Sequence, residues 1–152
     1  MNYDKSEIFN VNITGHSMFP ILNKKDVVVV KHSDIYQRGD IVVFDYGEKV
    51  HIIHRILYCG RNSQYYCKGD NAFRIEIISE ENILGKVIFV KKDNSILTLP
   101  VAADKFINLS LAVNREFLNN HCNLRKTMKS IVYKEYIKER DFLAWSILGK
   151  LF

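Results

Sequence analysis

Short runs of β-branched and aromatic residues, separated by turn residues, fill the first hundred residues of this chain. They occupy residues 8–14, 27–31, 41–44, 50–59, 65–68, 83–90 and 96–99. Val, Ile, Tyr and Phe favour strands, whereas Gly, Asn and Asp favour the turns between them. No long helical pattern separates these runs, which favours an antiparallel sheet. The spacing therefore predicts a mainly β fold, an antiparallel and partly barrel-like sheet.

Pro100 marks a change of period. From residue 102 onward, apolar residues recur at steps of three and four, as in Phe106, Leu109, Val113 and Phe117. This spacing predicts a helix with one buried face, and a second run follows at 124–131. The sequence thus predicts a β-rich domain over residues 1–100 and a C-terminal α-helical extension over residues 101–152.

The basic charge of the chain is concentrated in its last third. Residues 1–100 contain 13 Lys/Arg and 12 Asp/Glu, whereas residues 101–152 contain 9 and 5. A basic helical region favours anionic membrane surfaces, acidic peptides or nucleic acid, and it also serves as an ordinary solvated face. No recognised nucleic-acid-binding motif is present, so no nucleic-acid partner is expected.

Three cysteines at irregular spacing, Cys59, Cys67 and Cys122, do not form a disulfide framework. Reduced thiols in a cytoplasmic protein are the simplest interpretation, and a bridge between Cys59 and Cys67 across a turn is the alternative. No CxxC pair occurs, so we expect no metal site and no cofactor. Residues 1–16 show no secretory signal, and no run of 18 apolar residues occurs.

Four short segments occur in a defined order. Residues 15–20 read GHSMFP, residues 39–44 read GDIVVF, residues 54–55 read HR and residues 68–71 read KGDN. In this order the segments resemble the signal peptidase and LexA-like superfamily of serine peptidases. The stretch VHIIHRI over residues 50–56 is similar to the endoplasmic-reticulum-type branch, in which a histidine replaces the lysine base. The resemblance covers roughly residues 10–90 and implies the signal-peptidase/LexA-like catalytic fold.

The resemblance implies a catalytic set of Ser17, His54 and Asp70. A serine hydroxyl is a poor nucleophile unless a nearby base takes its proton, and imidazole exchanges protons near neutral pH. His51 and His54 are three residues apart on a predicted strand, so they should face opposite sides, and the resemblance selects His54. Asp70 would orient the histidine, as the acid of a catalytic triad does. Glu76 is the open alternative for that role.

Two further features follow from the same resemblance. The backbone N–H of Ser17 is the expected oxyanion donor, whereas Gly15 stands where many signal peptidases have a second donor, a serine hydroxyl. The substrate of these enzymes binds as an extended strand beside the site. Met18 and Phe19 are therefore predicted to line the substrate-binding pockets.

The leading functional prediction is a serine endopeptidase that removes a leader or signal segment from a peptide or small protein. One alternative is a LexA-like domain that cleaves itself or a bound regulator. Another is a non-catalytic peptide-binding module of the same fold.

The tail at residues 141–152 is apolar and aromatic but too short to span a bilayer. It is expected to pack as a helix on the β core or on a dimer surface. The alternative is a peripheral membrane contact with Trp145 at headgroup depth.

Overall fold

The computed structural model describes residues 7–47 and 50–148, in which eight strands precede three α-helices. Residues 149–152 of the predicted tail lie outside the described residues. The strands are β1 (Ile8–Asn12), β2 (Val27–Lys31), β3 (Ile41–Asp45), β4 (His51–Cys59), β5 (Gln64–Lys68), β6 (Glu76–Ser79), β7 (Ile83–Lys92) and β8 (Ser95–Leu97). A single 3-10 turn, Glu80–Asn82, separates β6 from β7.

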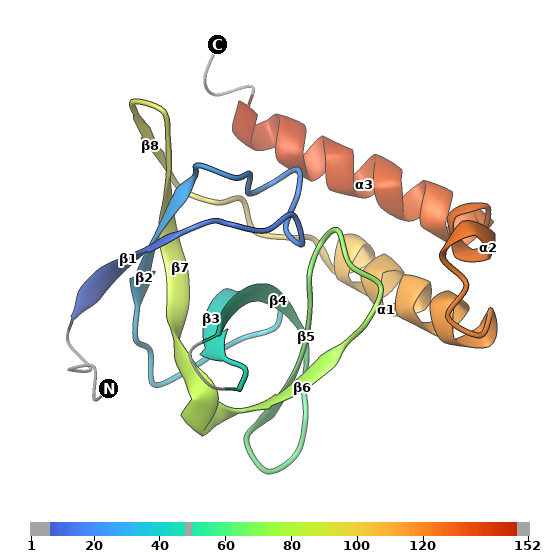
Figure 1. Cartoon of the computed structure of the whole chain (residues 1–152), viewed down its shortest axis with the longest axis horizontal. Coiled ribbons are helices and arrows are strands. Elements are labelled where there is room, and N and C mark those ends of the chain that lie inside the picture. The colour runs from blue at the N-terminus through green and yellow to red at the C-terminus, as the bar shows by residue number, and fades with distance from the viewer. Residues whose placement is uncertain (1–6, 48–49, 149–152) are drawn as a thin grey trace.

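All the strands belong to one antiparallel sheet that curls into a half-barrel, as Figure 1 shows. The strand order is β1-β2-β7-β3-β4-β5-β6, and β8 pairs with β7. Register shifts in the β2–β7, β3–β7 and β4–β5 pairs mark irregularities of the kind that bend a sheet. The predicted mainly β, antiparallel and partly barrel-like fold with a helical C-terminal part is confirmed. The short strand β6 was not predicted.

The central strand β3 is buried on both of its faces. Because successive side chains alternate across a strand, Ile41 and Val43 join one apolar cluster, whereas Val42 and Phe44 join another. The first cluster is the larger and extends to the helices through Phe106. This double burial explains why residues 41–44 read as a continuous apolar run rather than an alternating one.

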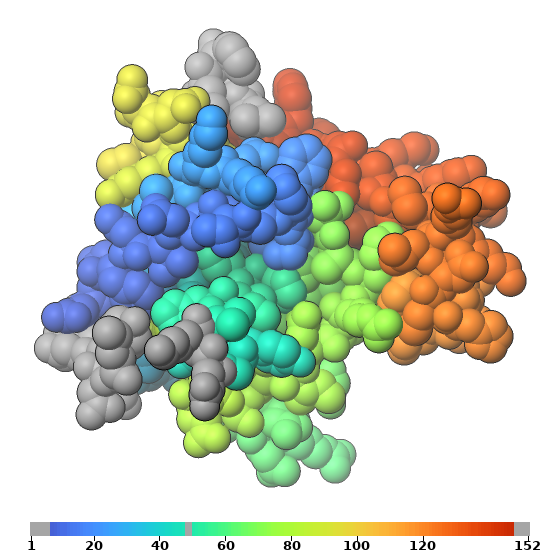
Figure 2. All heavy atoms as spheres, viewed as in Figure 1, coloured from blue at the N-terminus to red at the C-terminus, as the bar shows by residue number. Residues whose placement is uncertain are grey.

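The helical part contains α1 (Asp104–Asn119), α2 (Leu124–Met128) and α3 (Ile131–Leu148), which form the lobe at the right of Figure 2. The predicted run 124–131 is interrupted, because α2 ends at Met128 and Ser130 precedes α3. The Ser130 hydroxyl accepts a hydrogen bond from the backbone N–H of Tyr133 at 3.1 Å, as an N-terminal cap does. The change from strands to helices occurs between β8 and α1, and the assignment of two domains stays a prediction.

The described part of the apolar tail, residues 141–148, completes α3. Its inward side chains, Leu143, Ala144 and Ile147, are buried in the large cluster, as the packing interpretation predicts. Phe142 and Trp145 on the same turns are exposed. None of the helices in the described residues is both long and apolar enough to cross a bilayer.

Candidate active site

Ser17 lies in a tight turn between β1 and β2. The backbone N–H of Phe19 donates to the carbonyl of His16 at 3.1 Å, and that of Leu22 donates to Met18 at 2.9 Å. The Met18 side chain is buried, and its sulfur accepts a hydrogen bond from the N–H of Asp70 at 3.4 Å. Ser17 is therefore half-exposed on a turn that its neighbour anchors in the core.

His54 lies in the middle of β4 with its ring buried. Its Nδ1 is 2.9 Å from Oε2 of Glu76, the first residue of β6. His51 is exposed and its Nε2 lies 3.1 Å from a carboxylate oxygen of Asp45. The two histidines therefore differ in environment: His54 is buried, whereas the exposed His51 lines the pocket that begins at Ser17.

Asp70 does not contact His54. Both of its carboxylate oxygens accept hydrogen bonds from Arg55, from Nε at 2.9 Å and from Nη2 at 2.8 Å. Arg55 follows His54 on β4, so its side chain leaves the opposite face of the strand, and Asp70 lies on that face. Both partners are almost fully buried, which requires them to remain paired. The carboxylate that contacts the histidine is Glu76 rather than Asp70, so the expected Asp70–His54 contact is absent from the structure.

Gly69 separates the serine turn from the histidine. A Cβ atom at this position would lie 3.0 Å from Nε2 of His54 and in severe overlap with the backbone carbonyl of Ser17. Both groups therefore approach one point on the chain from two sides, which only glycine permits. Because Glu76 engages Nδ1, Nε2 is the ring nitrogen on the side of Gly69, and among the described residues no hydrogen bond joins it to the Ser17 hydroxyl.

The loop after Gly69 binds the same turn through its backbone and side chain. The N–H of Asn71 donates to the carbonyl of Ser17 at 2.8 Å, and its Nδ2 donates to the carbonyl of His16 at 3.1 Å. The KGDN segment thus positions the serine turn, a role that is visible only in the folded chain.

The helical part in turn holds this loop. Tyr136 on α3 donates from its hydroxyl to the carbonyl of Asp70 at 2.7 Å, and Arg140 donates to the side-chain oxygen of Asn71 at 3.1 Å. Asn114 on α1 donates to the carbonyl of Phe73 at 2.9 Å. The sequence contains no short-range signal for these contacts, because each joins residues at least 41 positions apart.

Lys68 is a fully buried lysine that directly precedes Gly69. Its Nζ donates to the hydroxyl of Ser110 at 2.9 Å and lies 4.6 Å from the centroid of the Tyr136 ring. Burial lowers the pKa of Lys68 to about 7, and the charge of Asp70 opposes that shift. Its amino group is directed at side chains of α1 and α3, the hydroxyls of Ser110 and Tyr136.

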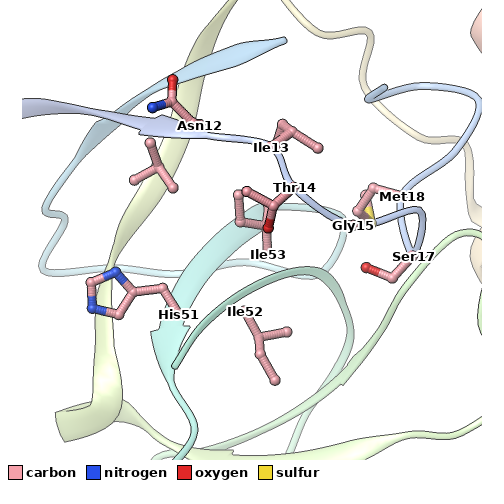
Figure 3. Close-up of a pocket in the computed structure, with 10 residues that line it drawn as sticks. Asn12, Ile13, Thr14, Gly15, Ser17, Met18, His51, Ile52 and Ile53 are labelled. Carbon is pink, nitrogen blue, oxygen red and sulfur yellow. The ribbon is translucent and has the colours of Figure 1, made fainter. Parts of the chain in front are cut away.

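A pocket of about 150 Å³ begins at Ser17 and extends between the end of β1 and the start of β4. Figure 3 shows the Ser17 hydroxyl directed into this space. The predicted substrate-binding residue Met18 contributes to the lining, whereas Phe19 is exposed and is not among the residues that line the pocket. The lining residues are Val11, Asn12, Ile13, Thr14, Gly15, Ser17, Met18, His51, Ile52 and Ile53. A pocket bordered by two strand segments is suited to an extended peptide.

Within residues 7–47 and 50–148, no group of three His, Cys, Asp or Glu side chains is placed to hold a metal ion. The three cysteines are free thiols; Cys67 is buried, and Cys59 and Cys122 are exposed. Burial raises the pKa of the Cys67 thiol to about 12, which makes it a poor nucleophile.

One comparison with known proteins gave a match. The model of the Peptidase S24-like family matches residues 1–88, more than half of the chain, including Ser17, His54, Asp70 and Glu76. This match supports the predicted superfamily of LexA-like and signal-peptidase-like serine peptidases, and the endoplasmic-reticulum-type branch stays a prediction. No curated protein and no solved structure matches the chain.

Proposed function

The chain belongs to the Peptidase S24-like family, and from that premise we propose a serine endopeptidase that removes a leader or signal segment from a peptide or small protein. Ser17 is the nucleophile, His54 is the general base and Glu76 is the residue that orients the base. One observation carries the proposal: Nδ1 of His54 lies 2.9 Å from Oε2 of Glu76, and Nε2 of His54 and the carbonyl of Ser17 both border the position that a Cβ atom of Gly69 would occupy.

The chemistry follows from these positions. The Ser17 hydroxyl attacks the scissile carbonyl while Nε2 of His54 takes its proton. Glu76 accepts a hydrogen bond from Nδ1 and stabilises the imidazolium that forms. The imidazolium then donates its proton to the leaving amine, and water repeats the cycle on the acyl-enzyme. The backbone N–H of Ser17 is the proposed donor to the oxyanion.

The substrate is a peptide in extended form. The pocket at Ser17 runs alongside the end of β1, which is an edge strand in the described sheet. An extended peptide in that space would pair with exposed backbone groups and direct alternate side chains into the pocket. Met18 contributes an apolar wall near the scissile bond.

The test is labelling with a serine-reactive fluorophosphonate probe, read by intact mass. Wild-type protein should gain one adduct at neutral pH, and Ser17→Ala and His54→Ala should not. Because some serine peptidases resist such probes, a peptide-library cleavage screen with the same variants follows. Labelling and cleavage that persist in Ser17→Ala would reject the assignment of the nucleophile.

Two other functions of this fold give different outcomes. The family match also favours a LexA-like domain that cleaves itself, and incubation of the purified chain alone would then yield two fragments in place of the intact mass. A non-catalytic peptide-binding module would bind library peptides and release them uncut. The absence of a hydroxyl side chain at Gly15 is the feature that favours this last alternative.

A further inference from the structure

One face of α3 presents a row of exposed aromatic, aliphatic and lysine side chains. At 100° per residue, the members fall within roughly 80° of the helix circumference and extend over about 21 Å of its length. We name this row the α3 outer stripe, and its members are Ile131, Lys134, Lys138, Phe142 and Trp145. Figure 1 shows α3 along the upper edge of the helical part, where its outer side faces no other element.

The apolar members of the α3 outer stripe are unusually exposed. Ile131, Phe142 and Trp145 are 81%, 67% and 66% exposed, and the two aromatic rings stack at 6.4 Å between centroids. The neighbouring helix α1 exposes mainly polar residues, such as Lys105 and Asn108, and one large apolar residue, Leu118, at 55%. α3 therefore carries large apolar side chains on two faces; the fold buries one, and on the exposed one they stand beside lysines.

The helical surface around the stripe carries an excess of positive charge. Residues 120–148 contain six Lys/Arg and three Asp/Glu. Each of the three acids is already within 4 Å of a cation, as in the pairs Glu135–Lys138, Glu139–Lys105 and Asp141–Arg140. Among the residues that the structure describes, no ion pair is recorded for Arg125, Lys126, Lys129 or Lys134.

We propose that the α3 outer stripe binds an anionic lipid surface. Phe142 and Trp145 would insert at headgroup depth, where tryptophan is favoured, and Lys134 would reach lipid phosphates with its extended side chain. The charge decides between this surface and a second copy of the chain. Two stripes packed together would place lysines against lysines, whereas anionic headgroups complement them.

The experiment uses the full chain and its own fluorescence. Trp145 is the sole tryptophan of the sequence, so emission reports directly on the stripe. Phosphatidylcholine vesicles that contain phosphatidylglycerol should shift the emission to shorter wavelength, and vesicles of phosphatidylcholine alone should shift it far less. Added salt should reverse part of the binding, since it screens the lysines.

Vesicle sedimentation of variants separates the aromatic and charged contributions. Phe142→Ser should weaken binding about tenfold, because its ring would no longer be buried in the interface. Lys134→Gln should weaken binding to anionic vesicles about fivefold. Ile96→Ser is the matched control, because Ile96 is equally exposed at 66% but lies on β8, and it should bind as wild type does.

Three results would overturn the proposal. The first is unchanged Trp145 emission with anionic vesicles, and the second is equal vesicle binding by wild type and Phe142→Ser. The third is an emission shift that depends on protein concentration without vesicles, because it would indicate that the stripe binds a second copy of the chain. None of these measurements uses peptidase activity, so they test lipid binding independently of the proposed catalytic function.

Discussion

Removal of the charge should have different effects at Glu76 and Asp70: at Glu76 it should lower reactivity, and at Asp70 it should lower stability. Glu76→Gln keeps the length of the side chain but replaces the carboxylate that faces Nδ1 of His54 at 2.9 Å. A histidine without its orienting acid adopts the wrong tautomer and loses imidazolium stabilisation, which costs about 10²-fold to 10⁴-fold in rate. The Glu76 side chain is 21% exposed, so the cost in folding free energy should be about 1 kcal/mol.

Asp70→Asn should act on stability instead. The Asp70–Arg55 pair has side chains only 1% and 2% exposed, with two hydrogen bonds at 2.8 and 2.9 Å. Removal of one partner leaves an uncompensated buried charge, which typically costs about 3–5 kcal/mol. That loss is a large share of the stability of a typical domain, about 5–15 kcal/mol.

Urea unfolding followed by circular dichroism gives the stability of each variant, and the rate of fluorophosphonate labelling under folding conditions gives the reactivity of Ser17. We expect Glu76→Gln to unfold near the wild-type midpoint and to label slowly. Asp70→Asn should unfold at much lower urea and should label well whenever it is folded. The opposite pattern, a stable Asp70→Asn protein that labels slowly, would refute the assignment of Glu76 and restore Asp70 as the orienting acid.

Three other predictions concern Gly69, Lys68 and Tyr136. Gly69→Ala should abolish labelling, because the added Cβ would displace Ser17 or His54. Gly15→Ala is the matched control and should label, because no atom lies within 4 Å of its added Cβ. Equal labelling of the two variants would contradict the site geometry. The lowered pKa of Lys68 means that the folded state binds fewer protons than the unfolded state above about pH 7, so stability should rise with pH by up to about 1.4 kcal/mol per unit. Urea unfolding at about pH 7.5 and 8.5 should show that the unfolding free energy of wild type rises with pH, and that of Lys68→Met should change less. An equal pH dependence of the two proteins would contradict the lowered pKa of Lys68. Tyr136→Phe removes the 2.7 Å hydrogen bond to the carbonyl of Asp70 and should lower the unfolding free energy by about 1–3 kcal/mol. Thermal unfolding measures this loss, and an unchanged midpoint temperature would contradict it.

Local pattern was sufficient to predict most of the fold. β-branched runs, turn residues and the change of period at Pro100 each involve residues within a few positions of one another, so propensity and periodicity report them directly. The same reasoning predicted different environments for His51 and His54, and the structure has His51 exposed and His54 buried. The strand β6 was not predicted, because a strand of four residues, Glu76–Ser79, is too short to show a periodic pattern. These residues form a strand by pairing with β5.

The sequence by itself determined the strand series, the helical last third, and the candidates Ser17, His54, Asp70 and Glu76. Only the tertiary structure decided which acid contacts the histidine, because that depends on which face of β4 each side chain leaves. His54 and Arg55 are adjacent in the chain, yet the strand directs their side chains to opposite sides. Glu76 therefore contacts His54 on one side, and Asp70 contacts Arg55 on the other. The contact between the helices and the loop at Asp70 likewise exists only in three dimensions, since it joins Tyr136 to a residue 66 positions earlier.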